Sequence, residues 1–225
     1  PRGRIYDRNY NLLVDNQAIT EIVYKKDKNI NVKDELDLID SIINYIDLDY
    51  SKLNIRNLKE YYLILYKDLC DDKITEEEYL KYKRRILSQE DINNLKISRI
   101  TDDDLKVFDE LDLKKAYLYY LMNRGYSYQD KIIKRENVTD SEITFFSEND
   151  IKGFSTKISW ERIYPYGDTF KSILGTVGSI PKERKDEYLN NGYSLDDIVG
   201  LSNIELQYED ILKGIKAVYK KIDNN

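Results

Sequence analysis

The sequence contains no histidine, and this removes several classes of functional site at once. Ser/His/Asp and Cys/His nucleophile systems, histidine-bound zinc and histidine pH switches all require an imidazole side chain. Cys70 is the single cysteine, so neither an intramolecular disulfide nor a thiolate metal cluster can form. Because a lone cysteine in an apolar helix is usually buried, we expect Cys70 to pack in a core rather than to act as a nucleophile.

A long apolar segment is also missing. No run of about 18 apolar residues occurs, so the sequence predicts no membrane-spanning helix. The first residues, Pro1 to Arg4, are neither an initiator methionine nor a signal peptide, and we therefore expect further residues upstream in the source protein. The net charge is 36 − 42 = −6, the wrong sign for coating a phosphate backbone, so nucleic acid is not an expected partner.

The composition is that of a folded chain. It has 225 residues, of which 41% are hydrophobic and 35% are charged. This is too apolar for a disordered tail, and the length corresponds to one or two domains with a sizeable core. The 21 tyrosines could form a glycan-stacking surface, but aromatic residues are equally common in strands and cores. Carbohydrate binding is therefore an alternative that composition leaves open.

Extended segments are predicted near both ends of the chain. The first comprises Gly3–Tyr6, a turn at residues 7–9, and then Leu12–Val14 and Ile19–Tyr24, with the polar residues 15–17 between them. Alternation from Phe154 to Arg162 predicts another strand ahead of Pro165. A last strand is predicted from Ile215 to Ile222. We interpret these segments as antiparallel strands.

The middle of the chain has helical spacing. Apolar residues recur every three or four positions from Val32 to Ile46, and helices are also predicted over Leu58–Leu69 and Leu111–Met122, the latter with Gly125 as its C-terminal cap. Threonines at positions 75, 101 and 139, each followed three residues later by a carboxylate, predict helix starts. The three aspartates after Thr101 suit a helix dipole, and they lack the alternating ligands and the glycine of a calcium loop. A short strand is predicted over Asp130–Arg135.

The final third predicts short helices over Thr169–Leu174, Lys182–Leu189 and Ser202–Leu212. Ser202 and Glu205 have the spacing of a capping box. Strands near both ends and helices between them favour an α+β class. We predict an antiparallel strand-rich base formed by residues 1–31 and 151–225, with an inserted helical head lobe over residues 32–150.

Three blocks of sequence carry a more specific pattern. The first is Arg2-Gly3-Arg4-Ile5-Tyr6-Asp7-Arg8-Asn9, followed by Leu12, Leu13 and Val14. The second runs from Arg162 through Tyr164, Pro165, Gly167 and Phe170 to Gly175 and Gly178. The third is Gly200-Leu201-Ser202-Asn203-Ile204-Glu205, with Gln207, Tyr208, Leu212 and Gly214 after it. In order and spacing these blocks resemble the N-terminal non-catalytic module of class B penicillin-binding proteins, often called the dimerisation or pedestal domain.

The resemblance implies that the motif residues are structural, and that they hold the pedestal together and dock it to the next domain. The residues concerned are Arg2, Gly3, Asp7, Arg8, Asn9, Arg162, Tyr164, Pro165, Gly167, Gly175, Gly178, Gly200, Ser202, Glu205, Tyr208 and Gly214. It implies no catalytic residue, metal or cofactor in this chain. The turn residues and glycines also make sense as plain architecture, because they permit tight turns and close backbone approach.

The resemblance further implies a parent peptidoglycan D,D-transpeptidase of the elongation type from a Firmicutes-like source, with a membrane anchor upstream and an extracytoplasmic location. Implied partners are a SEDS-family glycan polymerase, an MreC-like scaffold and the parent's own transpeptidase domain, which we expect to lie beyond Asn225. A homodimer is left open. The alternatives are a stand-alone adaptor domain and the pedestal of a division or sporulation paralogue.

Two chance matches to transpeptidase motifs occur. Ser179 to Lys182 fits SxxK and Ser147 to Asn149 fits SxN, but Pro181 is unfavourable inside the helix that SxxK requires, at a cost of about 3 kcal/mol. No Lys-Ser/Thr-Gly triplet is present. We therefore expect the chain not to react with penicillin.

Two positions depart from the family pattern. Tyr10 stands where the family usually has glycine, so the left-handed residue of the turn is expected at Asn9 or Asn11, or the turn is of another type. Asn203 also replaces a usual glycine, which is tolerable if Ser202 caps a helix that begins at Asn203.

Two hypotheses about tertiary structure follow. Because opposite charges recur in all three blocks, we predict an ion-pair network of Glu205 with Arg162 and either Arg2 or Arg4; the alternative is three solvated side chains. We also predict that the helical lobe is distinct, moves relative to the base and offers a partner groove. The alternative to a groove is that the apolar residues of the lobe fill its own core, which we expect for most of Tyr61, Tyr62, Leu65, Leu118 and Leu121.

Overall fold

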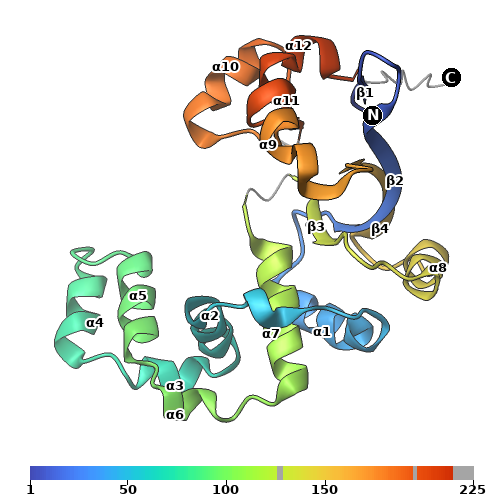
Figure 1. Ribbon diagram of the computed structural model, residues 1–225. Coiled ribbons are helices and arrows are strands. Elements are labelled where there is room, and N and C mark those ends of the chain that lie inside the picture. Colours follow the sequence, from blue (N-terminus) through green and yellow to red (C-terminus); the bar gives the residue numbers. More distant parts are fainter. Residues whose placement is uncertain (126–128, 195–196, 215–225) are drawn as a thin grey trace, which may run out of the picture. The chain divides into compact units, whose positions relative to one another are not determined.

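The computed structural model describes residues 1–125, 129–194 and 197–214, and the chain divides into two compact units (Figure 1). The terminal unit combines Pro1–Ile19 with Ile158–Asn225, and the insert unit is Thr20–Lys157. Strands β2 (Leu12–Tyr24) and β4 (Phe154–Ile163) have residues in both units. The predicted boundaries of base and head lobe at 31/32 and 150/151 stay a prediction.

Short antiparallel pairings connect the strands. β1 (Ile5–Tyr6) pairs with β2, with Ile5 opposite Val14, and β3 (Lys131–Lys134) pairs with the other end of β2, with Val23 opposite Ile132. β4 also pairs with β2. In the terminal unit, β5 (Val177–Ser179) and β6 (Ile198–Gly200) form a separate antiparallel pair. The fold is α+β, as the sequence predicts.

Two strand predictions need correction. The predicted interruption at residues 15–17 is wrong, since β2 runs without a break from Leu12 to Tyr24. Asp15 and Asn16 stay in the strand because their polar side chains find partners, Asp15 with Arg4 and Asn16 with Arg162. Strands β5 and β6 were not predicted, because three residues are too few to show an alternating pattern. The strand predicted over residues 215–222 lies outside the described residues.

Helices make up most of the insert unit. They are α1 (Val32–Ile42), η1 (Ile43–Tyr45), η2 (Tyr50–Lys52), α2 (Ile55–Leu65), α3 (Lys67–Asp71), α4 (Glu76–Lys83), α5 (Gln89–Arg99), α6 (Asp102–Leu105), α7 (Glu110–Asn123) and α8 (Asp140–Glu148). The helix starts predicted at Thr75, Thr101 and Thr139 are confirmed, and the structure has a capping box at each of them. The single helix predicted over Leu58–Leu69 is two helices, divided at Tyr66, whose φ and ψ are −117° and 48°. Helix α5 was not predicted.

The described residues of the insert unit form two apolar clusters. The larger one joins β2, α1, α7 and α8 and consists of Ile22, Tyr24, Ile39, Ile42, Ile43, Ile46, Leu48, Tyr117, Leu118, Leu121, Met122, Ile133, Phe146 and Phe154. The smaller one contains Tyr62, Cys70, Ile100 and Leu105. Cys70 is buried as predicted, and burial raises the pKa of its thiol. Of the five residues predicted to fill this core, Leu65 is exposed, because it is the last residue of α2.

The helices of the terminal unit are short. They are η3 (Gly167–Phe170), α9 (Lys171–Leu174), η4 (Lys182–Arg184), α10 (Lys185–Asn190), α11 (Asn203–Gln207) and α12 (Glu209–Leu212). They lie in the three segments where the sequence predicts helices. Among the described residues, no helix combines the length and apolar character needed to cross a membrane.

A pH-dependent contribution is expected from the α4–α5 pair. The side-chain hydrogen bond from Arg99 and the backbone hydrogen bond from Thr75 lower the pKa of Glu78 to about 2. Because the folded pKa lies below the unfolded value of about 4.3, the stabilisation is complete above that value and is lost as the pH falls toward 2. We expect Glu78→Gln to destabilise the chain at pH 6 but to match the wild type near pH 2.

Urea unfolding followed by circular dichroism at pH 6, 4 and 2 measures this difference. Asp91→Asn serves as the matched control, since Asp91 belongs to the α5 capping box with Ser88 and forms no ion pair with any basic side chain that the structure describes. A gap between wild type and Glu78→Gln that is constant over the whole pH range contradicts the assignment.

Candidate functional site

The predicted network exists in the terminal unit and is centred on Glu205, whose side chain is 0% exposed. Its Oε2 accepts hydrogen bonds from Arg2 Nε at 3.1 Å and Nη2 at 2.8 Å. Its Oε1 accepts from Arg162 Nε at 2.9 Å and lies 2.8 Å from Arg162 Nη2. One glutamate thus joins the first, second and third blocks. The ion-pair prediction is confirmed with Arg2; Arg4 pairs with Asp15 instead.

Two further side chains complete this Arg–Glu network, which comprises Arg2, Arg162, Glu205, Glu209 and Asn16. Glu209 Oε2 lies 2.8 Å from Arg2 Nη2 and accepts from the Gly200 amide at 2.7 Å. Asn16 Oδ1 accepts from Arg162 Nη1 at 3.0 Å, and its Nδ2 donates to the Arg2 carbonyl at 2.8 Å. Two arginines and two glutamates balance in charge, which makes their burial tolerable.

The glutamates around Arg2 favour the charged form of its guanidinium group. Burial alone lowers the pKa of the Arg2 guanidinium, but the hydrogen bond with Glu209 and the charges of Glu205 and Glu209 outweigh burial, and the pKa is raised. Tyr193 donates to Glu209 Oε1 at 3.0 Å, and its pKa is raised by burial and then by that hydrogen bond. The two shifts favour a charged Arg2 guanidinium and a neutral Tyr193 hydroxyl.

The sequence did not indicate Asn16 or Glu209. The pattern predicts a polar break between strands at Asn16, whereas this residue lies within a strand and bridges two arginines. Glu209 follows Glu205 by four positions, a spacing that brings side chains to the same side of a helical segment. That four-residue spacing is the feature of the sequence that could have indicated Glu209.

The capping box predicted from Ser202 and Glu205 is wrong. Ser202 makes no side-chain cap hydrogen bond to α11, and its Oγ instead accepts from the Thr176 amide at 3.1 Å. The Glu205 side chain does not cap the helix because both of its oxygens are bound by arginines. Helix α11 still begins directly after Ser202, but the side chains of Ser202 and Glu205 connect the second and third blocks instead of capping it.

Several motif glycines lie where a side chain has no room. A Cβ on Gly175 would lie 2.0 Å from the Ser202 carbonyl oxygen, and one on Gly200 would lie 2.0 Å from that of Glu205. At Gly214 the nearest atom is the Pro1 carbonyl oxygen at 2.5 Å. At Gly178 it is Leu201 Cδ1 at 2.7 Å, the end of a flexible side chain that can move. Gly3 donates its amide to Leu212 O at 2.7 Å. The glycines therefore permit the close packing that places the arginines beside Glu205.

Other motif residues lie outside the network. Tyr164 donates to Gly175 O at 3.1 Å, and burial, followed by the charge of Glu205, raises its pKa. Pro165 is exposed between β4 and η3. Gly167 has a φ of 58°, and no atom lies within 4 Å of the position that a Cβ would take there. Tyr208 is half exposed.

The first block also contains a tight turn. Asp7 Oδ1 accepts from the amides of Asn9 and Asn11, both at 2.8 Å, and the side chain of Asn11 lowers the Asp7 pKa. Arg8 and Asn9 are exposed. The expectation that Asn9 or Asn11 takes the left-handed position is wrong, because Tyr10 itself has a φ of 63°. Asn203 likewise keeps a glycine-like φ of 49°, and its side chain donates to Ser172 O.

We expect Tyr10→Gly to stabilise the chain by about 1 kcal/mol, because it relieves a left-handed backbone that costs an L-residue roughly 1–2 kcal/mol. Glycine's greater freedom in the unfolded chain offsets part of this gain. Tyr10→Ala keeps the strain and is the matched control. Thermal unfolding of the two variants tests the expectation, and equal midpoints would show that the turn carries no such strain.

The two transpeptidase-like matches do not form a nucleophile site. Ser179 ends β5, and Pro181 has an extended backbone with ψ of 140°, so Ser179 and Lys182 do not share a helix. Ser147 lies in α8, where its Oγ is 3.1 Å from Thr156 Oγ1. Within the described ranges, no group of three or more cysteine, aspartate or glutamate side chains is placed to hold a metal ion.

A pocket of 460 Å³ adjoins the network. It is lined in part by Arg2, Asn16, Trp160, Arg162, Tyr193 and Lys213. The guanidinium groups at its wall are already bound by Glu205 and Asn16. The arrangement is therefore suited to holding the N-terminal strand, β4 and the α11–α12 segment together rather than to performing a reaction.

Comparison with known proteins gives consistent matches. The family model of the penicillin-binding protein dimerisation domain matches residues 1–225. Penicillin-binding protein 2A of Bacillus subtilis (strain 168) is 32% identical over 231 residues, which cover 100% of this chain and 32% of that protein. The chain thus spans about a third of the length of this curated relative.

Solved structures show the same fold. Penicillin-binding protein 2B from Streptococcus pneumoniae (strain 5204) aligns with a TM-score of 0.68 and 26% identity over 94% of this chain and 34% of its own. Penicillin-binding protein PBP2 from Helicobacter pylori, solved in complex with MreC, aligns with a TM-score of 0.54 over 95% of this chain and 28% of its own. At 16% identity, this second likeness concerns the fold alone.

Proposed function

Because the chain belongs to the family of penicillin-binding protein dimerisation domains, we propose that it is the non-catalytic pedestal of a class B penicillin-binding protein, a peptidoglycan D,D-transpeptidase. In this role it positions the catalytic domain of its parent and docks partners of cell-wall elongation. The observation that carries the proposal is the Arg–Glu network, in which buried side chains of all three blocks converge on Glu205.

The physical support is that the charged groups of the network are engaged with one another. Both oxygens of Glu205 and the guanidinium groups of Arg2 and Arg162 are used in mutual pairing. A buried pair of this kind specifies one arrangement of the segments that it joins, which is what a rigid support requires. The proposal places catalysis in the part of the parent protein that this chain does not span.

We further propose an extracytoplasmic location beside the membrane, with a SEDS-family polymerase and an MreC-like scaffold as partners. The support is the family membership together with the fold shared with a PBP2 that was solved with MreC. The insert unit, which the three motif blocks leave free, is the proposed docking surface for the scaffold.

Reaction with a fluorescent penicillin tests the catalytic part of the proposal. We expect no covalent labelling of the 225-residue chain, and labelling of a longer protein that includes the coding sequence downstream of Asn225. Label mapped to Ser179 in the short chain would contradict the proposal. A downstream sequence without SxxK, SxN and KTG motifs would favour a stand-alone adaptor instead.

Hydrogen exchange with and without the scaffold protein tests the docking part. We expect added protection between Val32 and Asp150. Protection confined to residues 162–178 would show that the insert unit is a passive spacer. The two experiments are independent, so the scaffold assignment can fail while the pedestal assignment stands.

A further inference from the structure

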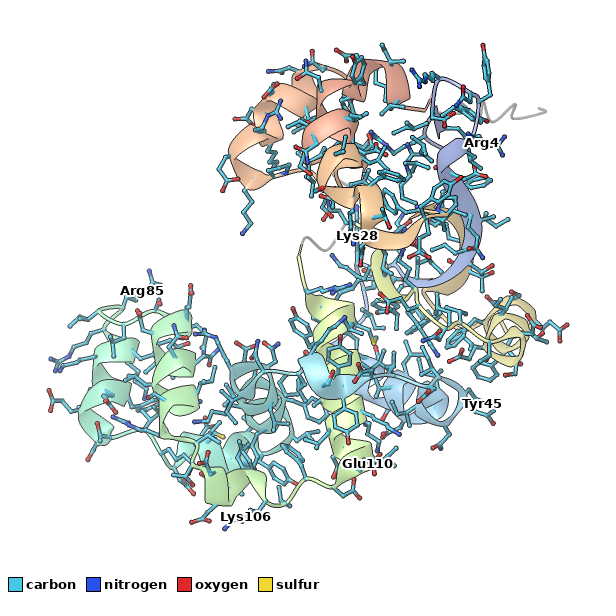
Figure 2. All side chains as sticks on the ribbon, in the orientation of Figure 1. Arg4, Lys28, Tyr45, Arg85, Lys106 and Glu110 are labelled. Carbon is cyan, nitrogen blue, oxygen red and sulfur yellow. The ribbon has the colours of Figure 1, made fainter. Side chains whose placement is uncertain are left out.

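One surface of the insert unit combines positive charge with exposed apolar side chains. It comprises the second half of α4 and the turn that leads to α5, and Figure 2 shows Arg85 at the outer end of this helical hairpin. We name it the basic tip. Its residues are Tyr79, Leu80, Lys81, Lys83, Arg84, Arg85 and Ile86.

The charge of the tip is opposite to that of the chain. Residues 79–89 contain four basic and no acidic side chains, a local charge of +4. Since the whole chain carries −6, the remaining residues carry −6 − 4 = −10. A concentrated positive patch on an acidic protein favours contact with an anionic surface.

Part of this charge is not neutralised within the protein. Lys81 pairs with Glu77 at 2.7 Å, and Lys83 lies over the Tyr79 ring, 4.7 Å from its centroid. Across the part of the chain that the structure describes, no acidic side chain forms an ion pair with Arg84 or Arg85. Both arginines are exposed and accessible to a ligand.

Apolar side chains are exposed beside these arginines. Tyr79 is 49% exposed, Leu80 44% and Ile86 66%. They neither belong to the two buried clusters of the insert unit nor line the pocket of the terminal unit. Since Arg85 lies at the outer end of the α4–α5 hairpin (Figure 2), the tip protrudes at that end of the hairpin.

The turn holds the arginine and the isoleucine in place. Ile86 donates its amide to Lys81 O and Arg85 donates to Tyr82 O, both at 2.9 Å. These are the two hydrogen bonds of a Schellman motif, whose left-handed position usually carries glycine. Arg85 occupies it with a φ of 59°. A cation is thus present where the backbone would favour a residue without a side chain.

We propose that the basic tip docks on the surface of a lipid bilayer that contains anionic headgroups. Lys and Arg side chains are attracted to such a surface, and exposed Leu, Ile and Tyr side chains can enter the boundary between headgroups and acyl chains. A protrusion fits a deformable surface, whereas a helical protein partner generally occupies a groove. A soluble anionic polymer would use the arginines but leave Leu80 and Ile86 in water.

Flotation with vesicles tests the charge requirement. We expect the 225-residue chain to bind vesicles of equal parts phosphatidylglycerol and phosphatidylcholine, and not phosphatidylcholine alone. Arg84→Glu/Arg85→Glu should weaken binding at least tenfold, from about 1 kcal/mol per cation near such a surface. Lys28→Glu/Lys33→Glu changes the net charge equally at exposed positions outside the tip and should change binding less than twofold.

Arg85→Gly removes a cation from the tip without destabilising the turn. Because glycine suits the left-handed position, this variant should unfold no earlier than the wild type and yet bind the vesicles more weakly. Ile86→Asn tests the apolar contact, with Ile55→Asn as its control at another exposed isoleucine. We expect about tenfold weaker binding for the first and no change for the second.

The proposal is overturned if the wild-type chain does not bind the anionic vesicles, or if the tip variants and their controls bind alike. Strong competition by soluble polyphosphate together with an unaffected Ile86→Asn variant would identify an anionic polymer as the ligand instead. Protection of the tip by a scaffold protein, without vesicle binding, would assign it to a protein partner. None of these outcomes depends on the pedestal function, which the penicillin experiment tests separately.

Discussion

Glu205→Gln is expected to destabilise the terminal unit by about 3 kcal/mol or more, because removing one member of a buried ion pair leaves its partners' charges uncompensated. Glutamine keeps the size of the side chain and removes its charge. The network then holds two buried arginines, Arg2 and Arg162, against Glu209 alone. Since Arg162 has a side chain that is only 3% exposed, water cannot readily replace the lost partner.

A matched control lies in the same unit. Glu187 forms a two-point pair with Arg184, with hydrogen bonds of 2.9 and 2.8 Å, but both side chains are substantially exposed. Exposed ion pairs contribute little to folding, so Glu187→Gln should leave stability nearly unchanged. The comparison separates burial from pairing geometry, because both glutamates bind arginine through two nitrogen atoms.

Trp160 provides the measurement. It is the only tryptophan in the chain, and it belongs to the terminal unit and lines the pocket beside the network. Urea unfolding followed by its fluorescence therefore reports on this unit. Similar losses for Glu205→Gln and Glu187→Gln would show that the network is no more important than a surface pair. A double-mutant cycle with Arg162→Met would measure the coupling directly.

The network also shows which features a sequence can predict. Helices start at Thr75, Thr101 and Thr139 as predicted, because the donor and acceptor of each capping box are three residues apart and the pattern contains the whole interaction. Ser202 and Glu205 have the same spacing but no capping box, because Arg2 and Arg162 bind the carboxylate. Arg2 is 203 positions away in sequence. Tertiary contacts of that separation outweigh local capping, and no window of sequence contains them.

The convergence of the blocks could nevertheless be inferred from complementary charges within them. The charges could not show whether Arg2 or Arg4 pairs with Glu205, because both arginines flank Gly3. Their environments decide: Gly3 packs against Leu212, while Arg4 lies beside Asp15 on the neighbouring strand. Asn16 was missed for a related reason. A polar residue within a strand looks like a break until its bonding partners are known.

The residues with left-handed backbone are also determined by contacts that the local sequence does not show. Tyr10 and Asn203 stand where the resemblance implies glycine. The sequence predicts the left-handed residue beside Tyr10 and predicts Asn203 as the first residue of a helix. The structure keeps the left-handed backbone at both positions. Backbone geometry at these turns is fixed by the surrounding contacts, among them the Asp7 hydrogen bonds and the Asn203 bond to Ser172. The strain of a non-glycine residue is smaller than the loss of those contacts would be.

Gly175→Ala is expected to destabilise the terminal unit by about 2–6 kcal/mol, for two separate reasons. The residue has φ 90° and ψ −168°, a region that only glycine readily occupies, at a cost of about 1–3 kcal/mol for other residues. In addition, the new Cβ would lie 2.0 Å from the carbonyl oxygen and 2.7 Å from the carbonyl carbon of Ser202. These are backbone atoms, so the clash cannot be relieved by a rotamer change, and overpacking adds about 1–3 kcal/mol.

Gly167→Ala separates the two causes, because Gly167 also has a left-handed φ, 58°, but no atom within 4 Å of the Cβ position. It should cost only the strain of the left-handed backbone, about 1–2 kcal/mol. Trp160 fluorescence during urea unfolding measures both variants in the same unit. An excess loss for Gly175→Ala would show that the close approach of the second block to Ser202 is required for stability. Equal losses would mean that the backbone at Ser202 shifts freely, and the glycine would then matter for its conformation alone.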